Sequence, residues 1–218
     1  MIIAIDGPSG AGKSTLADRL AETLGFIHID TGAMYRAIGL YADENGVDTT
    51  DAAGVIALLP KLTVGVSFNE NGQLVFVNGR DVTTDIRKPE VSMFASNVSK
   101  IPEVRRYLVD EQRRIAGEMD IIMDGRDIGT VVFPDADVKV FLTASPETRA
   151  ERRYKEQIEK GFDVSFDEVL ADVIRRDEQD SKRAIAPLRP AEDAVIIDTS
   201  HLDFEESLIA LLRLIKGE

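Results

Sequence analysis

The sequence contains no cysteine, only two histidines and no apolar run long enough to cross a membrane. Without cysteine the chain forms neither disulfides nor cysteine–zinc sites, and it offers no thiol nucleophile. Its start, MIIAIDG, lacks the basic and long apolar regions of a secretory signal, so we expect a cytoplasmic protein with no membrane partner. The scarcity of histidine, limited to His28 and His201, disfavours general-base catalysis by that residue.

Positive charge is scarce relative to negative charge. Lysine and arginine total 26 against 39 acidic residues, a net charge of −13. Because so acidic a chain repels a polyanion, we expect no nucleic-acid partner, and a small anionic ligand needs a local basic site. No exposed apolar stripe marks a dimer face, so we expect a monomer. The length of 218 residues fits one or two domains.

The hydrophobic pattern predicts an α/β fold. Short apolar runs at 1–6 and 26–30 flank a glycine-rich loop and an amphipathic helix over 14–24, which is expected to stop at Gly25. Such a strand–loop–helix–strand unit is typical of a parallel sheet. Further buried strands are predicted at 121–124, 138–142 and 194–198.

The middle of the chain differs, because alternating β-formers predict an antiparallel meander over 62–84. Its turns fall at 69–72 and at Asn78-Gly79, a strong hairpin signal. Helices are expected near 89–98, 102–117 and 203–216. Two more helices open with recognisable caps, one at Ser145 followed by Pro146 and one at Ser165 with Glu168.

The loop after the first predicted strand carries a phosphate-binding motif. Residues 7–14, GPSGAGKS, match G-x-x-x-x-G-K-[ST] in full and in the expected position between strand and helix. Backbone N–H groups of such a loop cradle phosphates, helped by the positive helix N-terminus. Lys13 can reach the β- and γ-phosphates, and the Ser14 hydroxyl can hold Mg²⁺.

Other charged residues follow predicted strands, where ligands of open α/β sheets bind. Asp124 is placed like a carboxylate that orients Mg²⁺ or its water, and Arg126 and Asp127 follow it. Thr31 and Arg36, after the second strand, are candidate anion ligands. Arginines also share helix faces on either side of a short glycine-containing turn, a pattern that resembles a lid closing over phosphates: Arg149, Arg152 and Arg153, then Arg176 and Arg183 with Asp180.

Four classes of protein share this loop. A GTPase switch is set aside because no asparagine is followed by lysine, so the guanine-reading N-K-x-D motif is absent. A DNA-translocating motor is usually larger, and the acidic charge opposes DNA binding. A small-metabolite kinase stays possible. A nucleotide kinase fits best, since it combines small size, the loop, an arginine-bearing acceptor site and a lid.

Four segments together resemble the bacterial cytidylate kinases: GPSGAGKST, DTGAMYR, DGRDIGTVVFPDA and RDEQDSKRAIAPL. The resemblance covers nearly the whole chain, including the β-rich insert; one departure is Thr31, where serine is common in the family. It implies transfer of the γ-phosphate of ATP to CMP or dCMP with Mg²⁺. Open alternatives are a kinase for another nucleoside monophosphate or small metabolite, and a regulator that binds ATP without turnover.

The resemblance also implies a fold and a set of roles. The fold is a five-stranded parallel sheet with helices, formed by residues 1–31, 98–148 and 184–218; residues 32–97 form the acceptor region, and 149–183 form the lid and the following helix. ATP binding falls to Gly7, Pro8, Ser9, Gly10, Ala11, Gly12, Lys13, Ser14, Thr15 and Arg152. Acceptor binding falls to Thr31, Arg36, Ser96, Arg105, Arg126, Asp127, Arg176, Asp180 and Arg183. The catalytic group comprises Lys13, Asp124, Arg126 and Arg183, and Ser14 and Asp124 hold Mg²⁺.

Overall fold

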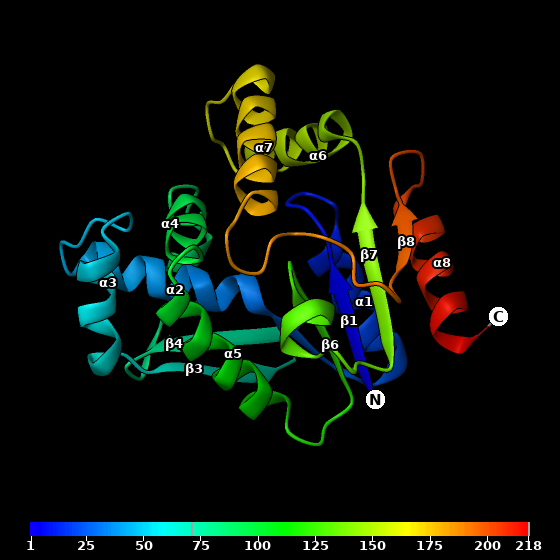
Figure 1. The fold of residues 1–218 in the computed structure, drawn as a ribbon. Helices are drawn as coiled ribbons and strands as arrows, with labels where there is room; N and C mark the ends of the chain where they lie inside the picture. Colours follow the sequence, from blue (N-terminus) through cyan, green and yellow to red (C-terminus); the bar gives the residue numbers. More distant parts are fainter. Residues whose placement is uncertain (71, 218) are drawn as a thin grey trace. The chain divides into compact units, whose positions relative to one another are not determined.

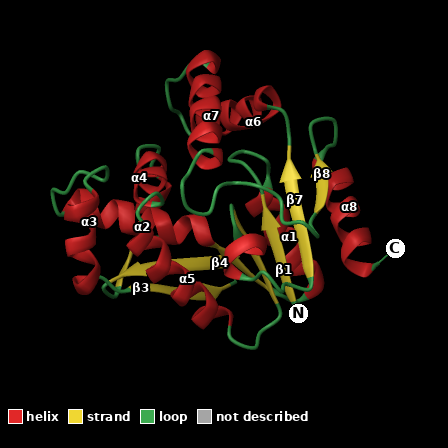
Figure 2. Cartoon of the chain, viewed as in Figure 1, coloured by secondary structure: helices red, strands yellow, loops and turns green. Residues whose placement is uncertain are grey.

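The computed structural model describes residues 1–70 and 72–217 (Figures 1 and 2). The chain forms two compact units. Unit 1 combines residues 1–27 with 120–218, and unit 2 contains residues 28–119. Across the described ranges, no helix is long and apolar enough to cross a membrane.

A five-stranded parallel sheet carries the strand order β2-β6-β1-β7-β8. Its strands are β1 (Ile2–Asp6), β2 (Ile27–Asp30), β6 (Ile121–Gly125), β7 (Val138–Thr143) and β8 (Val195–Asp198). In the register of the central strand, Ile3 pairs with Ile122 of β6 and Val138 of β7. The predicted α/β fold with a five-stranded parallel sheet is therefore confirmed.

The centre of the sheet is fully apolar because helices cover it. Ile3, Ala4 and Ile5 of β1 are completely buried, as expected for a parallel strand with neighbours on both sides and packing on its faces. Helix α1 (Lys13–Leu24) and helix α8 (Phe204–Lys216) pack on this core through their apolar stripes. Gly25 ends α1 in a left-handed conformation, which confirms the predicted stop.

The strand predicted at 194–198 exists, but the prediction that it is buried is wrong. Val195 is 44% exposed and Ile196 is 59% exposed. The reason is topological: β8 is the last strand of the sheet and pairs only with β7. An apolar run reads the same in a central strand and in an edge strand, so periodicity does not distinguish them.

Helices α6 (Pro146–Glu159) and α7 (Phe166–Ser181) are joined by a short loop and contact each other in unit 1 (Figure 1), and we call the pair the α6–α7 hairpin. Both predicted caps are confirmed: the Ser145 hydroxyl accepts from the N–H of Thr148, and Ser165 and Glu168 form a full capping box. The rings of Tyr154 and Phe166 meet edge to face at the turn, 6.2 Å between centroids. The capping box and this ring contact both fix the start of α7.

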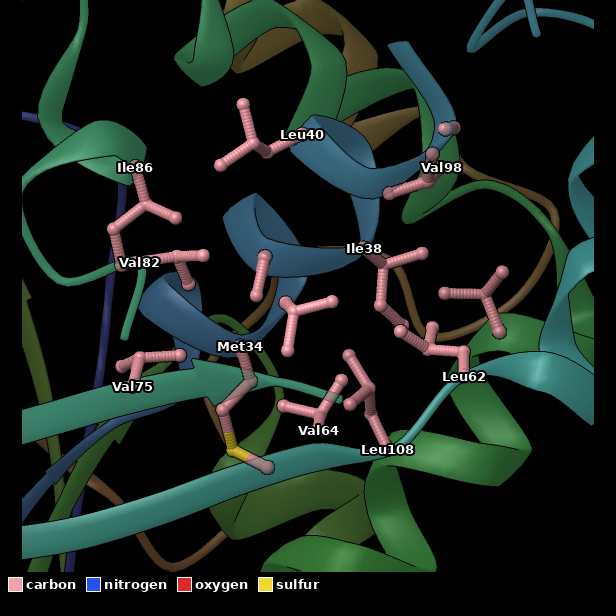
Figure 3. Packing of buried hydrophobic residues seen from close by; sticks show 14 of the residues in the cluster. Met34, Ile38, Leu40, Leu62, Val64, Val75, Val82, Ile86, Val98 and Leu108 are labelled. Atoms are coloured by element: carbon pink, nitrogen blue, oxygen red, sulfur yellow. The ribbon is translucent and has the colours of Figure 1, made fainter. Parts of the chain in front are cut away.

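Unit 2 is built around helix α2 (Thr31–Glu44). The predicted antiparallel meander is confirmed as β3 (Val64–Asn69), β4 (Gly72–Val77) and β5 (Arg80–Asp81), although its 69–72 turn includes Asn71, which lies outside the described residues. Figure 3 shows Met34 and Ile38 of α2 converging with Val64 and Leu108 in the core. Also present are α3 (Ala52–Leu58), α4 (Val91–Val98) and α5 (Pro102–Ala116), of which α4 and α5 confirm the predicted helices.

Helices α2 and α4 cross so closely that one position accepts only glycine. A Cβ at Gly39 would lie 2.6 Å from the Cβ of Phe94 and 2.9 Å from its carbonyl carbon. Alanine is the better helix former by about 1 kcal/mol, but overpacking a core costs about 1–3 kcal/mol. The steric term therefore decides the outcome at this position.

We expect Gly39→Ala to lower the free energy of unfolding by about 1–2 kcal/mol, measured by urea denaturation. Gly65→Ala is the matched control in the same unit, because its added Cβ would meet only the Cβ of Phe76 at an ordinary 3.5 Å. A midpoint for Gly39→Ala at or above that of the wild type contradicts the close crossing.

Candidate nucleotide-binding and phosphotransfer site

The predicted phosphate-binding loop spans the gap between β1 and α1. Gly7 leaves β1 with φ +150°, and a Cβ there would lie 2.0 Å from the carbonyl oxygen of Leu142 on β7. Only glycine tolerates both the conformation and this approach. The strand–loop–helix context that gives the motif its meaning is therefore confirmed.

Lys13 opens α1 and is buried, with only 5% of its surface exposed. Its Nζ donates to the carbonyl oxygen of Pro8 at 2.8 Å, so the side chain curls back over its own loop. Burial lowers the pKa of Lys13 to about 7, helped by the charge of Arg126 and opposed by Asp124, Asp6 and Asp180. The ammonium group is thus poised for a strong anionic partner.

The two predicted Mg²⁺ ligands lie together in unit 1. The Ser14 hydroxyl of α1 donates to a carboxylate oxygen of Asp124, at the end of β6, at 3.0 Å. Hydroxyl and carboxylate oxygens suit Mg²⁺, which is usually bound through one or two protein ligands, several waters and substrate phosphates. Among the described residues, no group of three or more histidine or acidic side chains could hold a metal ion. The Ser14–Asp124 pair therefore fits an Mg²⁺ ion whose remaining ligands come from water and a nucleotide.

Asp6, a residue the sequence analysis did not single out, anchors the loop that follows β6. Its carboxylate accepts the N–H groups of Ile128 and Gly129 at 2.7 and 2.8 Å. These amides open a one-turn π-helix, η3 (Ile128–Val132), directly after Arg126 and buried Asp127. Burial raises the pKa of Asp6 to about 6, although both backbone hydrogen bonds oppose the shift. Its only sequence signal is a carboxylate that ends an apolar strand.

Arg126 and Asp180 form an ion pair that joins the loop after β6 to α7. The Nε atom of Arg126 lies 2.9 Å from a carboxylate oxygen of Asp180. Burial alone would raise the pKa of Asp180, but Arg126, Arg183 and Arg176 outweigh it and the pKa lies below its usual value. Arg183 also donates to the Asp180 carbonyl at 3.3 Å. Arg126 from the loop after β6 thus gathers with Arg176 and Asp180 of α7 and with Arg183. The prediction that Arg183 shares the helix face of Arg176 and Asp180 is wrong, because α7 ends at Ser181 and Arg183 follows it.

The arginines of α6 contact the backbone beside the phosphate-binding loop. Arg149 is 3% exposed and donates to the carbonyl oxygens of Ser9 and Ala144 at 3.1 and 2.8 Å. Arg152 donates to the carbonyl oxygen of Thr199 at 2.8 Å and, more weakly, to that of Ala11 at 3.4 Å. Both guanidinium groups therefore lie against the nucleotide loop, on the helix face that the spacing predicts.

In unit 2, two of the predicted anion ligands lie at the start of α2. Asp30 caps the helix by accepting the N–H of Ala33 at 3.0 Å, and it pairs with Arg36 at 2.6 Å. Burial would raise the pKa of Asp30, but Arg36 and His28 lower it below its usual range. Thr31 is the first residue of α2 and is buried. Arg36 is therefore held in place by a carboxylate of its own unit.

The other two predicted residues of unit 2 lie where α4 ends and α5 begins. Ser96 and Arg105 are both buried. Arg105 donates to the Ser99 carbonyl at 3.4 Å, and its guanidinium carbon lies 5.7 Å from the ring centre of Tyr35 on α2. Because Tyr35 is one helical turn after Thr31, Arg105 lies against the same helix that carries Thr31 and Arg36.

A parallel sheet with a glycine-rich loop, a buried lysine and a Ser14–Asp124 pair defines a P-loop nucleotide-binding protein. The family model described as cytidylate kinase matches residues 3–217. The cytidylate kinase of Carboxydothermus hydrogenoformans is 50% identical over 99% of this chain and 97% of its own length. That of Thermotoga maritima is 49% identical over 98% and 96%. The chain belongs to the cytidylate kinase family, which confirms the sequence-based resemblance.

The fold also has a solved counterpart at low sequence identity. An uncharacterized protein from Eubacterium ventriosum superposes with a TM-score of 0.54 over 100% of this chain and 99% of its own, at 14% identity. That likeness concerns the fold alone.

The lowered pKa of Lys13 predicts that ATP binding takes up protons. With a pKa of about 7, Lys13 is mostly neutral at pH 8 in the free protein, while a bound triphosphate raises that pKa and recharges the amine. We expect uptake of close to one proton per ATP at pH 8, measured by calorimetry in buffers of different ionisation enthalpy. Lys13→Arg, whose guanidinium stays charged, should abolish the proton uptake. Absence of proton uptake by the wild type would contradict the lowered pKa of Lys13.

Proposed function

We propose that this chain transfers the γ-phosphate of ATP to CMP or dCMP, giving ADP and CDP or dCDP. The observation that carries the proposal is the buried Lys13 inside a complete phosphate-binding loop, in a member of the cytidylate kinase family. Phosphoryl transfer needs little covalent help from a protein; it needs donor and acceptor in line and the charge of the migrating group neutralised.

On the donor side, we propose that the loop from Gly7 to Thr15 binds the ATP phosphates, with Arg152 beside it. Lys13 exchanges the Pro8 carbonyl for phosphate oxygens, a stronger and charge-assisted partner. Ser14 and Asp124 would hold Mg²⁺, which when bound neutralises phosphate charge. The 3.0 Å contact between these two side chains supports that pairing.

On the acceptor side, we propose two groups of ligands. Thr31, Arg36 and Arg126 bind the CMP phosphate, because arginine grips a phosphate with two hydrogen bonds. Arg176, Asp180 and Arg183 bind the ribose and the phosphates. For Arg126 this means leaving Asp180, the carboxylate that now holds it at 2.9 Å, for the phosphate of the substrate.

Cytosine recognition is proposed for Ser96, Arg105 and Asp127. Asp127 can accept a hydrogen bond from the N4 amine of cytosine, and Arg105 can donate to O2 and N3. Uracil presents an oxygen at the position of the amine, which would face a carboxylate without a proton between them. A buried mismatch of this kind costs on the order of 1–3 kcal/mol, or about ten- to a hundredfold in preference.

A panel of acceptors tests the activity. ADP release is measured with ATP and Mg²⁺ in the presence of CMP, dCMP, UMP, AMP or GMP. We expect CMP and dCMP to be preferred by at least about tenfold in kcat/KM. Equal rates with all acceptors contradict the cytosine assignment and favour a broader kinase; ATP binding with no acceptor-dependent ADP release indicates a regulator instead.

Asp127→Asn tests base recognition directly. The amide keeps the shape of the side chain but presents a donor as well as an acceptor, so we expect the CMP/UMP ratio of kcat/KM to fall about tenfold or more while the KM for ATP stays within about twofold. Asp135→Asn, an exposed aspartate nearby in the chain, is the control. An unchanged CMP/UMP ratio of kcat/KM would show that Asp127 does not take part in recognition of the base.

A further inference from the structure

One guanidinium group connects four separate parts of unit 1. Arg149 lies in the first turn of α6, and its side chain reaches Ser9 in the phosphate-binding loop, Ala144 after β7 and Asp177 on α7. The pair with Asp177 uses both terminal nitrogens, at 2.9 and 2.5 Å to the two carboxylate oxygens. Each nitrogen of the guanidinium therefore has a partner.

This ion pair is not a surface feature. The Arg149 side chain is 3% exposed and that of Asp177 is 25% exposed, whereas the pairs Arg19–Glu22 and Arg175–Asp172 are more than half exposed on both sides. Leaving a buried charge without its partner costs free energy, and a bidentate arginine–carboxylate pair fixes direction as well as distance. Arg149 and Asp177 thus hold α6 and α7 in one arrangement rather than merely attracting each other.

The two ends of this connection lie in parts of the site with different proposed tasks. At one end, the nucleotide loop touches Arg149 so closely that a Cβ on Gly10 would lie 3.2 Å from the Arg149 Cβ. At the other end, Asp177 precedes Asp180 by one turn of α7, and Asp180 is the partner of Arg126. The Arg149 side chain therefore links the phosphate-binding loop to the helix that carries proposed acceptor ligands.

We propose that Arg149 and Asp177 are positioning residues for phosphoryl transfer: they hold α7 in register with the nucleotide loop, so that Arg176, Asp180 and Arg183 meet the acceptor in line with the bound donor. The proposal rests on the acceptor roles given to those three residues above. Neither Arg149 nor Asp177 needs to touch a substrate, because each is already committed to protein groups on the buried side of the hairpin.

The two residues differ in what their removal disturbs, which makes the proposal testable. Asp177→Asn weakens the hold on α7 but leaves Arg149 bound to Ser9 and Ala144. Since misplacement by about 1 Å costs about a hundredfold in such reactions, we expect kcat to fall about tenfold or more and the KM for CMP to rise. The KM for ATP should stay within about twofold.

Asp172→Asn is the matched control. It makes the same chemical change on the same helix, but its ion pair with Arg175 is half exposed on both sides. Exposed pairs of this kind contribute little, so we expect all kinetic constants to stay within about twofold. Kinetics are measured at 25 °C alongside thermal unfolding, so that a loss of stability is separated from a loss of positioning.

Arg149→Lys serves as the second variant, and it covers the case in which Asp177→Asn does not fold. Lysine keeps a cation beside Asp177 but cannot form the bidentate pair or donate to both carbonyl groups, those of Ser9 and Ala144. We therefore expect a lower kcat and, unlike for Asp177→Asn, a raised KM for ATP. Because both changes break one connection, the double variant should be no slower than Arg149→Lys alone.

Several outcomes overturn the proposal. A variant at position 177 that melts earlier yet keeps the wild-type kcat and KM for CMP shows a structural role only. Equal rises in both KM values for Asp177→Asn show that the pair acts on the loop and not on α7. A wild-type chain that releases no ADP with CMP contradicts the proposed function itself, a result distinct from an active wild type with an unaffected Asp177→Asn.

Discussion

The approach of Gly7 to the carbonyl oxygen of Leu142 is the constraint on which the site depends. At this point β1 ends between two neighbouring strands, and the chain turns where no side chain fits. The turn delivers Lys13 to the first position of a helix whose axis is fixed by core packing on the sheet. Ser14 then meets Asp124 because β1 and β6 are adjacent and in register, Ile5 opposite Asp124. One steric condition thereby places the groups proposed for phosphate and metal binding.

The charges of unit 1 are buried in two distinct ways. Lys13, which is buried, and Arg126, which is partly buried, contact a carbonyl and a carboxylate, partners that a phosphate would replace under the proposed function with an interaction of equal or greater strength. Asp6 and Arg149 are instead enclosed by backbone groups and, for Arg149, by Asp177, all of which belong to the frame. Since every buried charge needs a partner, this division separates the groups that we propose exchange partners with substrate from the groups whose partners all belong to the protein.

Local sequence predicted the parts of the molecule that local chemistry determines. The phosphate-binding loop, the caps of α6 and α7 and the hairpin turn of unit 2 depend on a few adjacent residues, and all are as predicted. The exposure of β8 depends on which strand ends the sheet, and the role of Asp177 depends on a partner 28 residues away. Helix α2 is not among the predicted helices, because Gly39 in its interior has a low helix propensity that tertiary packing against α4 overrides.

The α6–α7 hairpin combines apolar packing between its two helices with polar contacts to the rest of unit 1. Its two helices hold each other through the small apolar cluster of Ala150, Val169 and Val173. Its attachment to the sheet runs instead through the hydrogen bonds of Arg149 and Arg152 to carbonyl groups. Because Arg149 is buried, its hydrogen bonds are costly to leave unpaired. They are also specific in direction, so they hold the hairpin in one geometry relative to the phosphate-binding loop rather than in a range of them.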